Sequence, residues 1–338
     1  MARLRRRLIS LVAVAAAATL AACGKPLPSG DMAGENATQL DAPTSAARLR
    51  TPGYVPDNVG VPDRGTVAVR FAAVVGDAPF RCGAAYAGIG ITASTVIPSD
   101  FRLYVYDVAL IDDRGRAVAV TLTQDGRWQY RNVALLDFED GTGPCAGGTH
   151  ETREVVTGTV PPGRYRGLVF TLGVPPDLNV GSPGLPWPPL ADPDLAWPPP
   201  GGFRFVKIDM ATSGQPIGVA VPYLAAPWVA GAAARPYGFP VHIGGADCPT
   251  SGPIPGCAFA NRVAITFPDF DPDRDVVLAD LRGLLGGSNV DFNTPATPAG
   301  CQSTWGDPDC APIVARIGLS YPGTVPPPQT FFRSGTAR

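Results

Sequence analysis

Glycine and proline recur along the whole chain, which holds 40 glycines and 39 prolines in 338 residues. In a helix interior, proline costs about 3 kcal/mol and glycine about 1 kcal/mol relative to alanine. A mostly helical fold is therefore excluded. Hydrophobic residues still make up 45% of the chain, which is enough for a sizeable core. Charged residues make up only 17% and the net charge is −2, which excludes a basic surface for nucleic acids.

From residue 66 onward, short apolar or alternating stretches are separated by turn sequences. In 100–111, Phe101 and Leu103 fall on one face of an expected strand, and Arg102 and Tyr104 fall on the other. Many such strands predict an all-β, antiparallel β-sandwich-like single domain. The other expected strands are 66–75, 117–122, 128–136, 154–160, 163–172, 202–209, 238–243 and 262–267, with short helices at 275–285 and 310–319.

The segment 174–200 stands apart because it contains many prolines, together with Trp187 and Trp197. Proline cannot donate to a β-ladder, so this segment is not expected inside a sheet. We expect a long Pro-rich loop, and long loops within compact domains often carry function.

The N-terminus has the form of an exported lipoprotein signal. A basic start, MARLRRR, precedes an apolar run too short to span a membrane, and the run ends in Leu20-Ala21-Ala22-Cys23. This ending resembles a bacterial lipobox, which implies cleavage before Cys23 and lipidation of that cysteine; an ordinary secretory signal is the alternative. The expected domains are a signal peptide at 1–23, a flexible tether at 24–64 and a folded domain at 65–338. The expected location is the periplasmic face of the bacterial cell envelope, at the outer membrane.

Six cysteines remain when Cys23 is set aside, and an even number in an exported protein predicts disulfides. Their spacing suggests two short loops and one long loop, although other connectivities are open. The CxxC pairs and Cys/His clusters typical of zinc sites are absent from the sequence. The suggested pairs are Cys82–Cys145, Cys248–Cys257 and Cys301–Cys310.

The chain shows no familiar catalytic motif. It has no G-x-S-x-G elbow, no H-E-x-x-H pair, no P-loop, and no C-x-x-C-H for haem attachment. We therefore expect that the protein is not an enzyme, with a hydrolase that uses His242 kept as an alternative.

An acidic stretch resembles a calcium loop, with aspartates at 269, 271, 273, 275 and 280. Arg274, however, stands where such a loop needs glycine. Aspartates also form turns and helix N-caps, and we expect that structural role here.

Only two histidines are present, His150 and His242. His242 lies in the expected strand Phe239-Pro240-Val241-His242-Ile243-Gly244, where it is either a hydrogen-bonded core residue or a copper ligand. His150 lies in a polar loop near Cys145, where a surface role and a ligand role are both open.

Several longer strings together resemble the MbnP-like family, also called the metallo-mystery-pair four-Cys-motif proteins. The resemblance spans about residues 66–333. The strings are FAAVVGDAPF (71–80) with Cys82, DFRLYVYDVALI (100–111), WQYRNVALLDFED (128–140), GLVFTLGVP (167–175), HIG (242–244) followed by Cys248, FDPDRDVVLADL (270–281) and DPDC (307–310).

The resemblance implies a β-rich, exported copper-binding protein. It also implies a partner, MbnH, a di-haem protein similar to MauG and to cytochrome c peroxidases. This partner oxidises a tryptophan of the MbnP-like protein to kynurenine, and a histidine holds copper(I) nearby.

On this resemblance, His242 matches a family histidine and is the expected metal ligand. Trp197 matches the first tryptophan of a family segment that reads WPPPGGF here, so Trp197 is expected to be the oxidised residue and, as kynurenine, a second ligand. Trp128 is the alternative oxidation site, but its strand position predicts a buried core aromatic, whereas Trp197 is expected near the surface. His150 is a further candidate ligand. A structural or interaction lipoprotein that keeps the fold without copper is the alternative function.

Overall fold

The computed structural model describes residues 65–179, 187–198, 201–214, 238–246, 257, 259–304, 306–320, 325 and 327–336. The predicted signal peptide with Cys23, the tether and Cys248 lie outside the described residues. No helix in the described part of the chain is long and apolar enough to cross a membrane.

The first eight strands are β1 (Gly65–Val75), β2 (Ala78–Pro79), β3 (Tyr86–Ile89), β4 (Ser94–Asp112), β5 (Ala117–Ala119), β6 (Thr121–Leu122), β7 (Gln129–Tyr130) and β8 (Val133–Asp137). The later elements are η1 (Gly143–Cys145), β9 (Val155–Val160), β10 (Tyr165–Leu172), η2 (Pro193–Leu195), β11 (Arg204–Thr212), β12 (Val241–Gly244), β13 (Val263–Phe267), β14 (Asp275–Asp280), α1 (Leu281–Leu285), α2 (Cys310–Arg316) and β15 (Phe332–Thr336).

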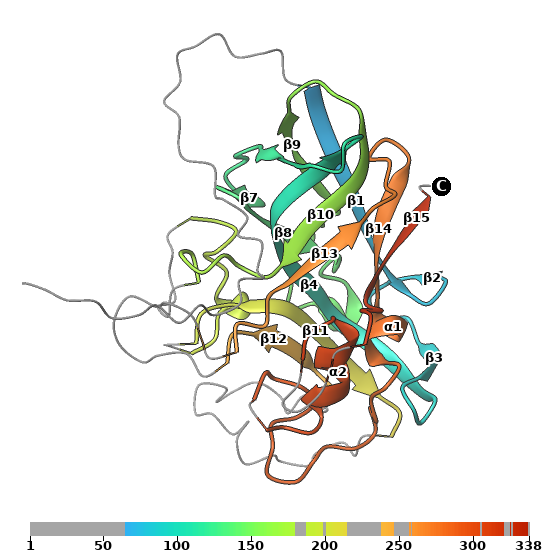
Figure 1. Ribbon diagram of the computed structural model, residues 1–338. Coiled ribbons are helices and arrows are strands. Elements are labelled where there is room, and N and C mark those ends of the chain that lie inside the picture. The colour runs from blue at the N-terminus through green and yellow to red at the C-terminus, as the bar shows by residue number, and fades with distance from the viewer. Residues whose placement is uncertain are drawn as a thin grey trace, which may run out of the picture. The chain divides into compact units, whose positions relative to one another are not determined.

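These strands form two sheets (Figure 1). The smaller sheet has the order β15-β14-β1-β9-β6, with β2 added to β1. The larger sheet has the order β12-β11-β4-β10-β13, and the long strand β4 also pairs with β3, β5 and β8. All of these pairs are antiparallel except β1–β14, which is parallel. The predicted all-β, antiparallel sandwich-like fold is confirmed, with that one parallel pair as an addition.

The main core lies between the two sheets. Phe71 of β1 and Phe170 of β10 come from different sheets, and their ring centroids lie 5.4 Å apart in an edge-to-face contact. Such aromatic pairs add to the free energy gained from burying apolar area. Phe101 and Leu103 of β4, which the alternation placed on one face of the strand, are fully buried in this core.

The opposite face of β4 is buried as well. Tyr104 belongs to a second, smaller core together with Leu190 and Leu195 of the Pro-rich segment and Phe203, which directly precedes β11. The Tyr104 hydroxyl donates a hydrogen bond to the Pro189 carbonyl at 2.7 Å. The described part of the Pro-rich loop therefore packs over the outer face of the larger sheet.

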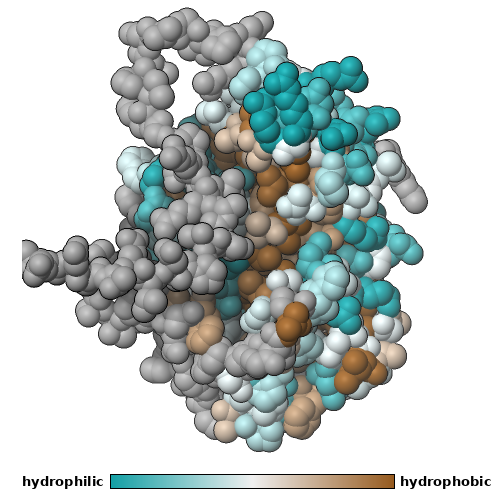
Figure 2. All heavy atoms as spheres, in the orientation of Figure 1, coloured by the Kyte–Doolittle hydropathy of each residue, from teal (hydrophilic) through white to brown (hydrophobic). Residues whose placement is uncertain are grey.

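Apolar side chains also reach the surface. Figure 2 shows hydrophobic residues gathered along the middle of the face that it displays, near β13, with hydrophilic residues above and to the right. The large apolar side chains that stay exposed among the described residues are Ile91, Ile97, Trp187, Phe292 and Val325.

One predicted helix requires correction. Residues 275–280 form strand β14, and the helix α1 begins only at Leu281. The segment is placed between β1 and β15, so its backbone groups bond to both neighbours. Asp280 ends the strand and caps the helix, because its side chain accepts a hydrogen bond from the Arg282 N–H. The second predicted helix is present as α2.

Candidate metal centre

His242 lies on β12, whose partner strand is β11. The backbone N–H of His242 donates a hydrogen bond to the Cys301 carbonyl at 2.8 Å. The backbone carbonyl of His242 accepts a hydrogen bond from the Ser303 hydroxyl at 3.2 Å. The Cys301–Cys310 disulfide ties this segment to α2. The backbone of His242 is thus fixed on both sides, and only 12% of its side chain is exposed.

The Nε2 atom of His242 lies 2.7 Å from Oδ1 of Asp209. Burial opposes the charge of Asp209, but His242 and Lys207 outweigh that effect and hold the pKa of the Asp209 carboxyl well below its ordinary value. An ionised carboxylate only accepts hydrogen bonds, so Nε2 carries the hydrogen and donates it. In the neutral ring, the lone pair is therefore on Nδ1.

A chain of ion pairs continues from Asp209 along the sheet. Lys207 Nζ lies 3.2 Å from Asp209 and 2.5 Å from Asp100, and Asp100 accepts two hydrogen bonds from Arg102 at 2.9 and 2.6 Å. Burial disfavours the charged forms of Lys207 and Arg102, but Asp100 overrides it and raises the pKa of both groups. Arg102 then reaches Asp192 at 2.8 Å. This last contact ties the η2 segment to the sheet.

Trp197 follows η2 and turns back onto β12. Its backbone N–H donates a hydrogen bond to the Gly202 carbonyl at 2.8 Å. The ring centroids of Trp197 and His242 lie 6.1 Å apart, edge to face. A Cβ atom at Gly244 would lie 2.4 Å from Trp197 Nε1, so only glycine at this position admits the indole ring. The structure thus brings together the two residues that the sequence analysis selected as the metal-binding pair.

Three buried nitrogens in this cluster lack a hydrogen-bond partner among the described residues. They are Nδ1 of His242, Nε1 of Trp197 and Nε of Arg204. The Arg204 guanidinium carbon lies 4.4 Å from the centroid of the Trp197 ring. Buried polar groups without hydrogen-bond partners are rare and destabilising, so three of them in one cluster indicate a functional site.

The donor set fits copper(I) in part. A neutral imidazole Nδ1 is a good copper ligand, and its Nε2–H···carboxylate bond is the usual support of a ligating histidine. The indole Nε1, in contrast, is a donor only, so unmodified Trp197 offers no lone pair to a metal. Met210, the one methionine among the described residues, is buried in the main core on the opposite face of β11 from Asp209.

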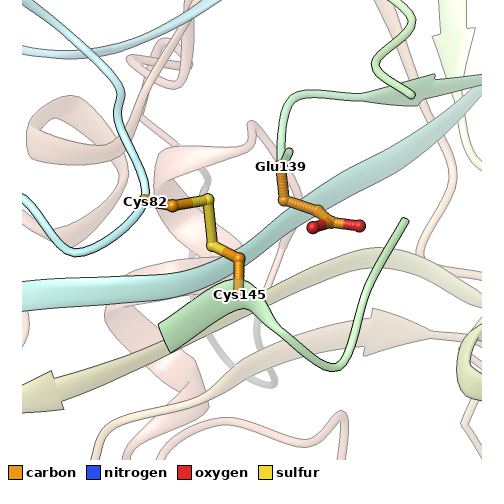
Figure 3. Close-up of side chains that lie close together, drawn as sticks. All are labelled: Cys82, Glu139 and Cys145. Atoms are coloured by element: carbon orange, nitrogen blue, oxygen red, sulfur yellow. A yellow bond between two sulfur atoms is a disulfide. The ribbon is translucent and has the colours of Figure 1, made fainter. Parts of the chain in front are cut away.

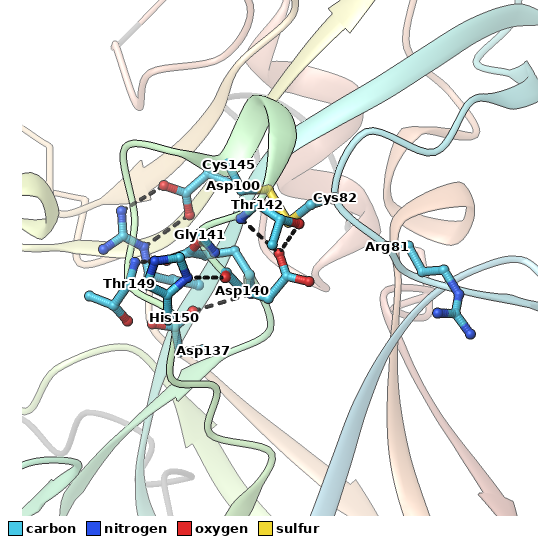
Figure 4. Close-up of a disulfide and its surroundings, with 12 residues drawn as sticks. Arg81, Cys82, Asp100, Asp137, Asp140, Gly141, Thr142, Cys145, Thr149 and His150 are labelled. Atoms are coloured by element: carbon cyan, nitrogen blue, oxygen red, sulfur yellow. Dashed lines mark hydrogen bonds and ion pairs between the residues drawn. A yellow bond between two sulfur atoms is a disulfide. The ribbon is translucent and has the colours of Figure 1, made fainter.

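His150 is in a different part of the fold. Its Nδ1 lies 3.1 Å from the Asp140 carbonyl, in the loop around the Cys82–Cys145 disulfide (Figure 4). Among the described residues, no hydrogen bond, ion pair or ring contact joins His150 to His242 or Trp197. The structure therefore does not bring His150 to the His242 site.

Trp128 precedes β7 and packs against the smaller core. Like Trp197 it is half-buried, and it also carries an arginine over its ring, with Arg127 at 4.8 Å. The expected contrast, with Trp197 near the surface and Trp128 buried, is absent. What separates the two tryptophans is the histidine beside Trp197.

Another group of candidate ligands, Cys82, Glu139 and Cys145, lies close together (Figure 3). Both cysteines are joined in a disulfide, so neither offers a thiolate. Glu139 accepts backbone hydrogen bonds from Gly141 at 2.8 Å and from Thr149 at 2.7 Å. This cluster is therefore a structural anchor for the loop.

Three aspartates of the calcium-like stretch, Asp271, Asp275 and Asp280, have structural roles. Asp271 accepts from the Asp273 N–H at 3.0 Å and from Arg274 Nε at 2.7 Å. Asp275 accepts from the Asp271 N–H at 2.8 Å, and Asp280 caps α1.

Two of the suggested disulfides, Cys82–Cys145 and Cys301–Cys310, are present. Cys257 is disulfide-bonded, while Cys248 lies outside the described residues, so that pairing stays a prediction. No sequence pattern singled out Asp209, Arg204 or Gly244 as residues of the site. Asp209 could have been noticed as a charged residue at the end of the expected strand 202–209.

Comparisons with known proteins follow this geometry. A protein-family model named MbnP matches residues 64–303. Among solved structures, MbnP from Methylosinus trichosporium is similar, with a TM-score of 0.67 and 29% sequence identity, over 82% of this chain and 100% of that chain. A search of curated proteins found no match.

Proposed function

The chain belongs to the MbnP family, a methanobactin-related family, and on that premise we propose that it is a lipid-anchored periplasmic copper-binding protein. It is not an enzyme. It is the substrate of a di-haem partner of the MbnH or MauG type, which oxidises Trp197 to kynurenine.

One observation carries this proposal. The ring of Trp197 faces the ring of His242, and each ring has a buried nitrogen without a described partner. Opening the indole ring turns Nε1 from an N–H donor into an aromatic amine, which does have a lone pair. The modified residue 197 and His242 Nδ1 would then hold copper(I), a metal ion that prefers soft or imidazole ligands.

The chain's own residues prepare this site before any metal arrives. Asp209 fixes the ring orientation of His242 through the bond at Nε2. The Arg102–Asp192 contact and the Gly202 carbonyl hold the segment that carries Trp197. Such supporting contacts typically account for ten- to a hundredfold in metal affinity.

The geometry disfavours the hydrolase alternative. In a hydrolase, the nitrogen opposite Asp209 would face a nucleophile. Here the Trp197 ring packs against the His242 ring. Among the described residues, no serine, threonine or cysteine side chain forms a hydrogen bond with His242 Nδ1.

The test is coexpression of the full chain with a di-haem partner, followed by peptide mass analysis and copper(I) titration. We expect one oxygen gained and one carbon lost on the Trp197 peptide, and copper binding that depends on this change. Trp197→Phe and His242→Ala should abolish binding, whereas the matched controls Trp128→Phe and His150→Ala should keep it. Modification of Trp128 would overturn the residue assignment. An unmodified protein that binds no copper would favour the structural lipoprotein.

The lipid anchor is tested separately. Cys23→Ser should move the protein from the detergent phase to the soluble periplasmic fraction, because several acyl chains are needed for lasting anchorage. Unchanged partitioning would exclude lipidation at this residue.

A further inference from the structure

We propose that Arg204 is a positioning residue that holds the ketone oxygen of the kynurenine formed at position 197 and so directs its amine toward His242. This inference rests on the proposed function and names a residue on which the site depends.

Arg204 is held in place from two sides. Its backbone begins β11, where Arg204 pairs with Gly244 of β12. Its Nη1 donates to the carbonyls of Asp194 at 2.7 Å and Ala196 at 2.6 Å. These bonds fix the guanidinium over the Trp197 ring, 4.4 Å from its centroid. Its Nε–H is buried and has no partner among the described residues.

The oxidation creates the acceptor that this donor lacks. With the di-haem partner as catalyst, tryptophan and two hydrogen peroxide molecules give kynurenine, formic acid and one water molecule. The indole C2–C3 bond breaks, C3 becomes a ketone carbon beside Cβ, and C2 leaves as formate after hydrolysis of the formyl amide. The tryptophan loses four electrons, which reduce the two peroxide molecules, and four protons go with them into water.

The new ketone oxygen forms on the former C3, which joins Cβ to the benzene ring, and the guanidinium lies over the indole that contains this carbon. The amine forms at the former Nε1, on the atom nearest to Gly244. In an isolated ortho-amino ketone these two groups close an internal N–H···O=C hydrogen bond. A charged Arg204 donor competes for the oxygen, because charge-assisted hydrogen bonds are about twice as strong as neutral ones. The amine is then left free to face His242 Nδ1.

Arg204→Lys tests this role, because lysine keeps the positive charge but lacks the Nε–H fork. Arg127→Lys is the matched control, since Arg127 covers the ring of Trp128 in the same way. Each full-length variant is coexpressed with the di-haem partner and measured for the mass of the 197 peptide, the ketone stretching frequency by resonance Raman spectroscopy, and copper(I) affinity.

In the wild type, the ketone stretch should lie below that of free kynurenine in an aprotic solvent, where only the internal N–H···O=C hydrogen bond is present. In Arg204→Lys, the 197 peptide should still be converted, the ketone stretch should rise, and the copper affinity should fall roughly tenfold, as expected for one lost charge-assisted hydrogen bond. Arg127→Lys should match the wild type in all three measurements.

Three results overturn the inference. One is a wild-type ketone stretch no lower than that of free kynurenine in an aprotic solvent, a measurement that needs no variant to fold. Another is an Arg204→Lys protein with the wild-type stretch and affinity. The third is an Arg204→Lys protein that stays unconverted, which would place Arg204 in the oxidation step. Absence of kynurenine from the wild type is a different result, because it overturns the proposed function itself.

Discussion

Asp209 and His242 are joined by a 2.7 Å contact between Oδ1 and Nε2, although 33 residues separate them in the chain. The contact arises because β11 and β12 pair antiparallel, with Lys207 opposite His242. It leaves Nδ1 as the free nitrogen of the histidine, and Nδ1 belongs to the ring that faces Trp197.

Removing the charge of Asp209 should weaken copper binding. In Asp209→Asn the side chain keeps an oxygen but is no longer an anion, so its hold on the Nε2–H is weaker. We expect a ten- to a hundredfold loss of copper(I) affinity, measured by competition with a chelator. Asp194→Asn, which alters an exposed carboxylate 3.8 Å from Arg102, is the control. Equal affinities in Asp209→Asn and the wild type would contradict the orienting role.

Gly244→Ala should displace the indole of Trp197. The added Cβ would lie 2.4 Å from Nε1 and 2.5 Å from the Phe203 carbonyl, and such overpacking typically costs about 1–3 kcal/mol. We expect a lower midpoint in urea unfolding and less kynurenine at position 197. Gly65→Ala is the control, because a Cβ there meets no atom within 4 Å. Wild-type kynurenine yield in Gly244→Ala would show that the close packing is dispensable.

The two described disulfides should contribute differently to stability and to the site. Loop-closure entropy assigns about 4 kcal/mol to Cys82–Cys145 and about 2.6 kcal/mol to Cys301–Cys310, which span 63 and 9 residues. The short disulfide is nevertheless the one next to the site, because the Cys301 carbonyl accepts a hydrogen bond from the backbone N–H of His242.

Replacing Cys301 and Cys310 by alanine should therefore cost less stability but more copper affinity than replacing Cys82 and Cys145. Chemical unfolding and copper(I) titration on both double variants test this expectation. The opposite order in copper affinity would mean that the short disulfide does not support the site.

Asp137 makes the stability of the domain depend on pH. Burial, and next the charge of Glu139, raise the pKa of Asp137 to about 8, against about 3.9 in an unfolded chain. Because the folded state binds this proton more tightly, the stabilisation is complete below the unfolded pKa and is lost as the pH rises toward 8.

Asp137→Asn removes this titration. The free energy of unfolding of the variant minus that of the wild type should therefore increase between about pH 4 and about pH 8, as measured by urea unfolding across that range. A difference independent of pH would contradict the raised pKa. Asp113→Asn, which alters a surface residue, should show no such trend.

Local patterns were enough to predict most of the sheet. The alternation in 100–106 correctly placed Phe101 and Leu103 on one face of the strand, the face that packs into the main core. It did not show that the opposite face, with Tyr104, is also buried, because the covering residues come from the Pro-rich segment about 90 residues later. The stretch 275–280 was wrongly assigned to a helix, since its place between β1 and β15 is a property of the whole fold rather than of its own sequence.

The sequence by itself determined the β class, the exclusion of zinc-type cysteine motifs and, through its resemblance to a family, the pair of Trp197 and His242. Composition, periodicity and spacing are properties of neighbouring residues, so they can be read along the chain. Only the tertiary structure decided that Asp209 orients the histidine, that Arg204 covers the tryptophan, and that His150 is not brought to the site. Those relationships depend on strand register and on which faces are buried together, and both are set by packing between segments distant in sequence.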